Sequence, residues 1–194
     1  MNKKGILFVI TGPSGVGKGT VLAEVRKQKD VYFSISATTR QPREGEQDGV
    51  HYFFLTREQF EQKIGENGFL EHAEFSGNCY GTPAAPVDAH LEQGKDVILE
   101  IEVQGAMQVH EIRPDAVRIF LAPPSYAELE NRLTGRGTET EEAVRMRLET
   151  AKHELTLALQ FDYVVVNHTV EQAVADVLAI MQAEACRSQR VTLE

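Results

Sequence analysis

Cysteine is scarce in this chain of 194 residues, and its histidines form no pattern suited to a metal. The two cysteines, Cys79 and Cys186, lack metal-ligand spacing, and we expect both to be free thiols. The six histidines form neither a His-x3-His nor a His-Glu-x-x-His pattern. We therefore expect neither a disulfide framework nor a metal site built from protein ligands alone.

Long apolar runs are also missing. No segment approaches the ~20 apolar residues that a membrane span requires. Lys3 and Lys4 precede apolar residues, as in a signal peptide, but a polar loop follows too soon, at Gly12. We therefore expect a cytoplasmic protein without a membrane partner.

Positive charge is in short supply. The chain has 20 Lys and Arg against 29 Asp and Glu, and its formal net charge is −9. General nucleic-acid binding requires a basic face, so we expect no nucleic-acid partner. An acidic protein that binds a polyphosphate must instead gather its basic residues locally, which makes arginines and lysines beside loops informative.

A glycine-rich loop is the most informative feature that is present. It follows the apolar run 6–10 and precedes a helical pattern, which is the setting of a phosphate-binding P-loop. The glycines allow successive N–H groups to point at one anion, and Lys18 adds a charge that reaches the β- and γ-phosphates. The predicted phosphate-binding residues here are Gly12, Pro13, Ser14, Gly15, Val16, Gly17, Lys18, Gly19 and Thr20.

The loop departs from the common pattern at one position. Gly19 stands where Ser or Thr usually follows the lysine, and the hydroxyl comes one residue later, at Thr20. Because Gly19 has no side chain to ligate Mg²⁺, we expect water and nucleotide oxygens to hold the metal, as Mg²⁺ tolerates.

Strand and helix patterns alternate along the chain. This alternation predicts an α/β fold with a P-loop NTPase-type parallel sheet flanked by helices. Buried strands are expected at residues 6–11, 97–101, 117–121 and 163–166. Helices are expected at residues 19–29, 83–93, 104–112, 125–134 and 169–187, with capping boxes at Ser125 and Thr169.

Two segments interrupt this alternation. Residues 34–82 are rich in Tyr, Phe, Thr and Gly, and predict a small mixed α/β insertion. Residues 126–157 predict a helical lid, because an Arg-rich helical pattern is broken by glycines and followed by a long amphipathic helix. The predicted core of this single domain, which spans about residues 5–187, comprises residues 1–33, 83–125 and 158–194.

Arginines recur in both segments. Arg40 and Arg43 lie three residues apart in a Pro/Gly loop and can grip one phosphate bidentately, although a solvated loop with surface ion pairs is an equal alternative. In the lid, Arg132, Arg136 and Arg147 suit contacts to a transferring phosphate. For these three, a solvated Arg/Glu helical surface is the alternative.

Two carboxylates lie near the end of the strand predicted at residues 97–101. Glu100 and Glu102 are two residues apart, so an extended chain points both to one face at the carboxyl end of the sheet. They suit a Mg²⁺–water network or the donors of a ligand, and exposed strand-end charges are the alternative. Tyr52, Tyr80 and Glu71, taken singly, are more typical of ordinary structure.

Eight motifs follow one another along the chain. They are the P-loop, Thr-Thr-Arg-x-x-Arg, His-Tyr-Phe-Phe, Phe-Leu-Glu, Tyr-Gly-Thr, Ile-Leu-Glu-Ile-Glu, Ala-Pro-Pro-Ser and Gly-Arg-Gly-Thr-Glu. In this order and at these separations, from about Ile6 to Asn167, they resemble the guanylate kinase family. The resemblance implies Mg²⁺-dependent transfer of the ATP γ-phosphoryl group to GMP or dGMP, giving ADP and GDP. It leaves open whether the protein is a homo-oligomer.

The resemblance also implies roles for individual residues. The P-loop, residues 12–20, would bind ATP through its phosphates, and Asn167 would lie near the adenine. Glu100 would contact Mg²⁺ through water. Catalytic roles would fall to Lys18, Arg40, Arg43, Arg132, Arg136 and Arg147. GMP would be bound by Ser36, Arg40, Arg43, Tyr52, Glu71, Tyr80, Thr82, Glu100 and Glu102. Of these, the two arginines and two tyrosines would hold the phosphate, and Ser36, Glu71, Thr82 and Glu102 would read the guanine.

The chemistry of guanine agrees with this assignment. Guanine presents N1–H and N2–H₂ donors along one edge, which a carboxylate accepts as a pair, whereas adenine would leave Glu71 unpaired. Many family members have Asp where this chain has Glu100 and Glu102, so the longer side chains must be housed.

Three alternatives stay open. A kinase for AMP, CMP or UMP is disfavoured by the acidic guanine-reading set. A non-catalytic guanylate-kinase-like module that binds phosphopeptides tends to have a degraded P-loop, whereas Lys18 and the lid arginines are intact here. A regulatory GTPase would need an Asn-Lys-x-Asp motif, which the sequence lacks.

Overall fold

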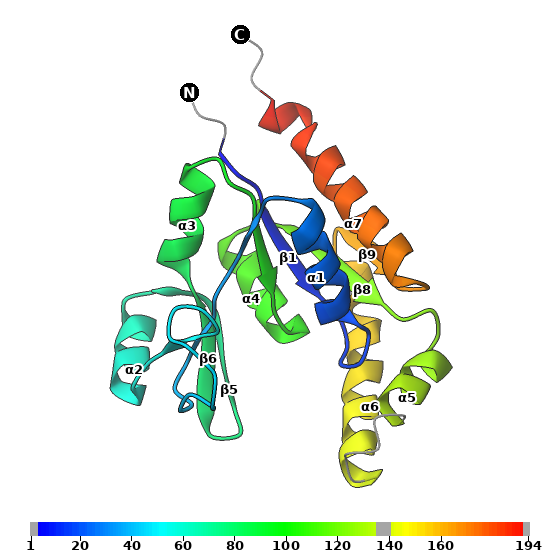
Figure 1. The fold of residues 1–194 in the computed structure, drawn as a ribbon, viewed down its shortest axis with the longest axis horizontal. Coiled ribbons are helices and arrows are strands. Elements are labelled where there is room, and N and C mark those ends of the chain that lie inside the picture. Colours follow the sequence, from blue (N-terminus) through cyan, green and yellow to red (C-terminus); the bar gives the residue numbers. More distant parts are fainter. Residues whose placement is uncertain (1–3, 135–140, 192–194) are drawn as a thin grey trace.

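A five-stranded parallel sheet forms the centre of the computed structural model, which describes residues 4–134 and 141–191 (Figure 1). Its strands lie in the order β2-β7-β1-β8-β9. Their bounds are β1 (Leu7–Thr11), β2 (Tyr32–Phe33), β7 (Val97–Glu100), β8 (Val117–Ala122) and β9 (Tyr163–Val166). The predicted P-loop NTPase-type α/β fold is confirmed, and all four predicted strands are present. Of the five strands in this sheet, only β2 was not predicted, because a strand of two residues is too short to show an apolar pattern.

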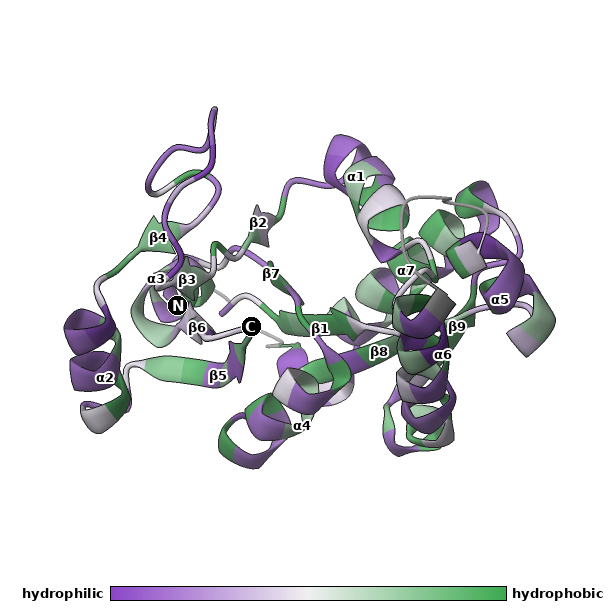
Figure 2. Ribbon diagram, turned by 90° about the horizontal axis from the view of Figure 1, so that it is seen from below, coloured by the Kyte–Doolittle hydropathy of each residue, from purple (hydrophilic) through white to green (hydrophobic). Residues whose placement is uncertain are grey.

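Helices cover both faces of this sheet, which explains why every residue of β1 and β8 is buried. Phe8 and Ile10 of β1 point to one face and pack with α1 (Lys18–Gln28) and α7 (Val170–Ala185). Leu7 and Val9 point to the other face and pack with α3 (Ala84–Glu92) and α4 (Val103–Ile112). Figure 2 shows β1 as a hydrophobic strand at the centre of the molecule.

The predicted helices agree closely with the structure. Those assigned to α1, α3, α4, α5 (Tyr126–Thr134) and α7 begin and end within two residues of their predicted bounds. The capping box at Thr169 forms only in half, because Thr169 accepts from the N–H of Gln172 while the Gln172 side chain donates to Asp176. Short 3₁₀ turns follow at Ala158–Gln160 and Ser188–Arg190.

The insertion has a sheet and a small core of its own. Its strands, in the order β4-β3-β6-β5, are β3 (Ala37–Thr38), β4 (Phe53–Phe54), β5 (Phe69–Phe75) and β6 (Asn78–Pro83). Helix α2 (Arg57–Gly65) opens with a complete capping box at Thr56. Buried Phe60 stacks on Phe69 with ring centroids 4.4 Å apart, beside buried Ala37 and Cys79.

The helical arm consists of α5 and α6 (Glu141–Thr156). Its small core joins Leu129 and Leu133 of α5 to the face of α6 that carries Leu148, Ala151 and Leu155, as the amphipathic pattern predicted. In Figure 1 the insertion and the arm extend downward on either side of the sheet, while the start of β1 and the end of α7 lie toward the top. The residue limits given above for core, insertion and lid stay predictions.

The structure also describes the two cysteines and the lengths of the helices. Cys79 is buried and Cys186 is exposed, and both are free thiols. Within residues 4–134 and 141–191, every helix is too short or too polar to cross a bilayer.

Candidate active site

The P-loop connects the end of β1 to the start of α1, and its glycines are required by conformation and by packing. Gly15 has φ 83° and Gly17, the N-cap of α1, has φ 93°, both in the left-handed region. A Cβ added to Gly15 would lie 2.8 Å from Leu133 Cδ2 of the helical arm. A Cβ added to Gly17 would lie 2.8 Å from Asn167 Nδ2. Glycine therefore lets both the arm and Asn167 approach the loop.

Two side chains hold the carbonyl of Val16 within the loop. Asn167 Nδ2 donates to Val16 O at 2.8 Å, and Arg132 Nη1 donates to the same oxygen at 3.3 Å. The Val16 carbonyl oxygen carries partial negative charge and would repel an anion bound in the loop. The two donors reduce this repulsion by hydrogen-bonding to that oxygen. Asn167 is only 4% exposed, so its amide positions the loop. Its predicted place near the adenine stays a prediction.

Lys18 is the first residue of α1 and lies beside the end of β7. Its Nζ donates to Ile101 O at 3.2 Å. Glu100 is the last residue of β7, and its Oε1 lies 3.8 Å from the position that a Cβ on Gly19 would occupy. The strand ends there, so Glu102 is not part of it and instead occupies the N-cap of α4. The structure thus brings Lys18, Gly19 and Glu100 together at the carboxyl end of the sheet.

Two arginines of the helical arm reach the P-loop. Arg147 Nη2 donates to Ser14 Oγ at 2.5 Å, and Arg132 donates to Val16 O as described above. Arg132 Nε also donates to Glu128 Oε1 at 3.0 Å, so the predicted Arg/Glu helical surface is present as well. Arg136, the third predicted lid arginine, lies outside the described residues.

Glu154 of α6 is a residue near this site that sequence reasoning missed. Burial raises its pKa to about 7, with further repulsion from Glu102 that Lys18 partly offsets. The helical arm therefore brings a carboxyl group close to the P-loop lysine. In the sequence, Glu154 is one of several acidic residues on an amphipathic helix and has no distinguishing signal.

In the insertion, Arg40 is held by a residue of its own loop. Its Nη1 and Nη2 donate to the two carboxylate oxygens of Glu46 at 2.9 and 3.0 Å. Glu46 also accepts from the backbone N–H of Arg43 at 2.7 Å. These contacts, led by the bond from Arg40, lower the pKa of Glu46 to about 2. Sequence reasoning assigned no role to Glu46, whose only signal is its place six residues after Arg40.

The two predicted tyrosines lie beside Arg40. The guanidinium carbon of Arg40 is 5.4 Å from the ring centroid of Tyr52, and Tyr52 meets Tyr80 edge-on at 6.3 Å between centroids. The pKa of Arg40 is raised, chiefly by Glu46 and also by Tyr80. The structure thus gathers a guanidinium and two phenols from three segments, and these groups are hydrogen-bond donors of the kind that suits an anion.

A hydrogen-bonded pair joins β5 to β6 in the same insertion. Thr82 is fully buried, and its Oγ donates to Glu71 Oε1 at 2.7 Å. Burial raises the pKa of Glu71, the bond from Thr82 opposes this, and the charge of Glu102 raises it further. Ser36, half-buried just before β3, holds β4 through a bond from Phe53 N to its carbonyl at 2.9 Å. Glu71 therefore interacts with two other residues predicted to read the guanine, with Thr82 through a hydrogen bond and with Glu102 through charge repulsion.

The chain matches the family model described as guanylate kinase over residues 4–184, which is nearly its whole length. It belongs to the guanylate kinase family. The chain is 56% identical over 188 residues to a guanylate kinase of Thermus thermophilus, covering 97% of this chain and 86% of the relative. To the guanylate kinase of Bacillus cereus it is 55% identical over 192 residues, covering 98% and 94%.

A solved structure agrees. The crystal structure of guanylate kinase from Anaplasma phagocytophilum superposes with a TM-score of 0.76 at 32% identity, covering 97% of this chain and 90% of that one. The predicted family and class of enzyme are thus confirmed. This guanylate kinase is a nucleoside monophosphate kinase, an ATP:GMP phosphotransferase.

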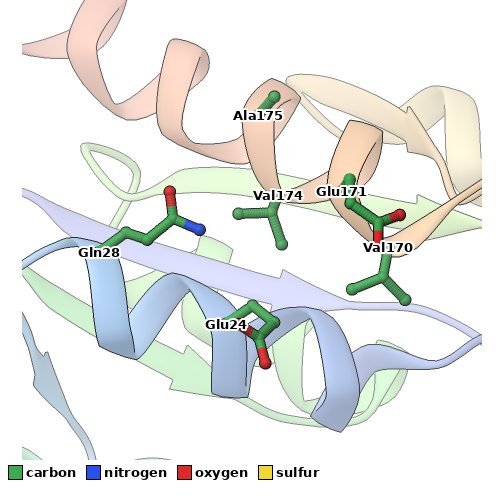
Figure 3. A pocket seen from close by; sticks show the side chains of 6 residues that line it. All are labelled: Glu24, Gln28, Val170, Glu171, Val174 and Ala175. Carbon is green, nitrogen blue, oxygen red and sulfur yellow. The ribbon is translucent and has the colours of Figure 1, made fainter.

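A small pocket of this guanylate kinase lies away from these residues. It lies between the later turns of α1 and the first turns of α7 and has a volume of about 200 Å³ (Figure 3). Ligand pockets usually occupy about 300–1,000 Å³, so it is too small for a nucleotide. Its lining residues are Glu24, Gln28, Val170, Glu171, Val174 and Ala175. In the described part of the chain, no three His, Cys, Asp or Glu residues cluster as metal ligands.

Proposed function

We propose that this guanylate kinase transfers the ATP γ-phosphoryl group in line to GMP or dGMP with the residues assembled above, and that Mg²⁺ accompanies ATP. The observation that supports the proposal is that two separate parts of the chain present two different sets of binding groups. One is the P-loop with Lys18, and the other is an insertion that presents an arginine–tyrosine cluster and the hydrogen-bonded Glu71–Thr82 pair.

On the donor side, the P-loop backbone and Lys18 hold the ATP phosphates. Arg132 and Arg147 already contact the loop, and we infer that they exchange part of these contacts for phosphate oxygens when ATP binds. Charge develops on the transferring group in the reaction, so these cations lower the barrier by electrostatic stabilisation.

On the acceptor side, Arg40, Arg43, Tyr52 and Tyr80 hold the GMP phosphate, and Glu71 with Thr82 reads the guanine edge. The attacking oxygen belongs to a phosphate that is already anionic, so the reaction needs no general base. Catalysis therefore consists of positioning two phosphates in line and excluding water.

The residues next to Lys18 fit a Mg²⁺ ion that arrives with ATP. Gly19 has no side chain to fill the space beside it, and Glu100 Oε1 lies 3.8 Å from where a Cβ on Gly19 would be. Oxygen ligands and several retained waters are what Mg²⁺ prefers. Bound there, the ion would neutralise negative charge on the phosphates, and Glu100 would orient its water shell.

We further propose the cytoplasm as the location of this enzyme, because its nucleotide substrates are held there. Its partners in this proposal are ATP and GMP or dGMP.

The test is a coupled assay of ADP release with Mg-ATP and, separately, GMP, dGMP, AMP, CMP and UMP. We expect turnover with GMP and dGMP only. Turnover with another base would remove Ser36, Glu71, Thr82 and Glu102 from guanine reading while keeping the phosphate machinery. Folded, ATP-binding protein that turns over none of the five would favour the phosphopeptide-binding module instead.

A further inference from the structure

Helix α4 of the core is hydrogen-bonded to strand β5 of the insertion through one amide side chain. Gln108 Nε2 donates to His72 O at 3.1 Å, and Gln108 Oε1 accepts from His72 N at 3.0 Å. Both backbone groups of His72 are therefore bound by a residue 36 positions away in the chain. His72 directly follows Glu71, so these two hydrogen bonds fix the backbone next to the proposed guanine-reading carboxylate.

One turn earlier on α4, Gly105 makes room for that carboxylate. A Cβ at this position would lie 2.9 Å from Glu71 Oε2 and 3.3 Å from its Cδ. Glycine within a helix is less favourable than alanine, so helix formation does not explain its presence. The open space is used by Glu71 instead.

Glu71 is thus constrained from three directions. Thr82 Oγ donates to its Oε1 at 2.7 Å, Gly105 leaves space beside its Oε2, and Gln108 holds the next backbone unit. Guanine recognition by a carboxylate needs both oxygens in line with two donors, a geometry that a small displacement breaks. We propose that Gly105 and Gln108 of α4 are positioning residues that set guanine selectivity by fixing the Glu71 carboxylate, an inference that rests on the proposed role of Glu71.

The first test is Gly105→Ala. Alanine favours the helix, so we expect the thermal midpoint to be unchanged or higher. Because its methyl group displaces the carboxylate, we expect KM for GMP to rise about tenfold or more, as for one lost hydrogen bond, with KM for ATP within about twofold. The ratio of kcat/KM for GMP over AMP should fall by a similar factor. A parental KM for GMP and a parental ratio would overturn the proposal.

The second test is Gln108→Met, which keeps the side-chain length and removes both hydrogen bonds. We expect KM for GMP to rise by about tenfold while kcat at saturating GMP stays within about threefold. Glu111→Ala on an exposed position of the same helix is the matched control and should match the parent. Equal losses for ATP and GMP would indicate a merely structural link between α4 and β5, and would overturn the proposal.

Calorimetric binding of GMP to each variant separates this inference from the proposed function. If the parent binds GMP with the expected preference over AMP, and Glu71→Gln abolishes that preference, the role of Glu71 stands and the α4 variants decide the inference. If Glu71→Gln retains the preference, the proposed function of Glu71 fails first. Normal selectivity in Gly105→Ala beside a defective Glu71→Gln would reject only the role of α4.

Discussion

The P-loop and the proposed guanine-reading region of this enzyme are assembled from the chain in opposite ways. The P-loop is a run of nine consecutive residues, 12–20, whose glycines free the backbone to approach an anion. The proposed guanine-reading region combines residues from distant segments. They are the side chains of Glu71 on β5 and Thr82 on β6, and Gly105 on α4, which leaves space beside Glu71. Recognition by backbone is therefore local in the sequence, whereas recognition by side chains depends on long-range packing.

The two regions also differ in what supports them. The P-loop is held from outside by Asn167, Arg132 and Arg147. In contrast, Arg40 of the insertion is held by Glu46 of the same loop. We therefore expect donor-side geometry to respond to changes in the helical arm, and acceptor-side phosphate geometry to respond to changes within one short loop.

Replacement of Lys18 tests the donor side and should have the largest effect. Lys18→Ala removes the positive charge that would stabilise the transition state, so kcat should fall by about 1,000-fold or more while the fold is retained. ADP release measures kcat, and circular dichroism shows whether the fold is retained. Lys27→Ala, an exposed lysine of the same helix, is the control. A Lys18→Ala enzyme with the parental kcat would contradict the proposed mechanism.

Replacement of Glu71 tests the acceptor side through its base. Glu71→Gln keeps the shape but presents an amide N–H₂ to donors of guanine, so kcat/KM for GMP should fall by about 100-fold. KM for ATP should stay close to the parental value. Glu74→Gln, exposed on the same strand, controls for loss of a charge. An unchanged kcat/KM for GMP would remove Glu71 from guanine reading.

Replacement of Glu46 tests whether the loop alone positions Arg40. Glu46→Gln weakens the bidentate pair, so KM for GMP should rise by about tenfold while KM for ATP does not change. Glu44→Gln in the same loop is the control. The depressed pKa of Glu46 means that the pair is intact above its ordinary pKa of 4.5 and is lost as the pH falls through about 2. An unchanged KM for GMP would show that Arg40 needs no such support.

Replacement of Glu154 should have the smallest effect, visible in stability. Its raised pKa means that the folded protein binds a proton that the unfolded chain releases, so stability falls as the pH rises from 4.5 to about 7. Glu154→Gln should remove this decline and raise the thermal midpoint at pH 8 by a few degrees. Thermal midpoints from pH 4.5 to 8 measure it, with exposed Glu149→Gln as control. Parallel curves for Glu154→Gln and the parent would contradict the prediction.

Sequence patterns predicted much of the fold because the signals are local. Apolar runs marked four core strands, and 3.6-residue periodicity with capping residues marked the helices to within two residues. Strands β2 and β3 were not predicted, since two-residue strands form only where a neighbouring strand supplies hydrogen bonds. The two-residue β4 lies within residues 51–55, whose pattern is strand-like. The motif order was sufficient to indicate the family.

The sequence by itself therefore determined the P-loop, the α/β fold and the kinase family, because each depends on residues close together in the chain. Only the tertiary structure decided how the site is supported. It placed Asn167 on Val16, Glu46 on Arg40, Glu154 near Lys18, and Gly105 against Glu71. Most of these contacts join residues far apart in the chain, and ordinary residue types make all of them. Their meaning comes from packing, which no local pattern records.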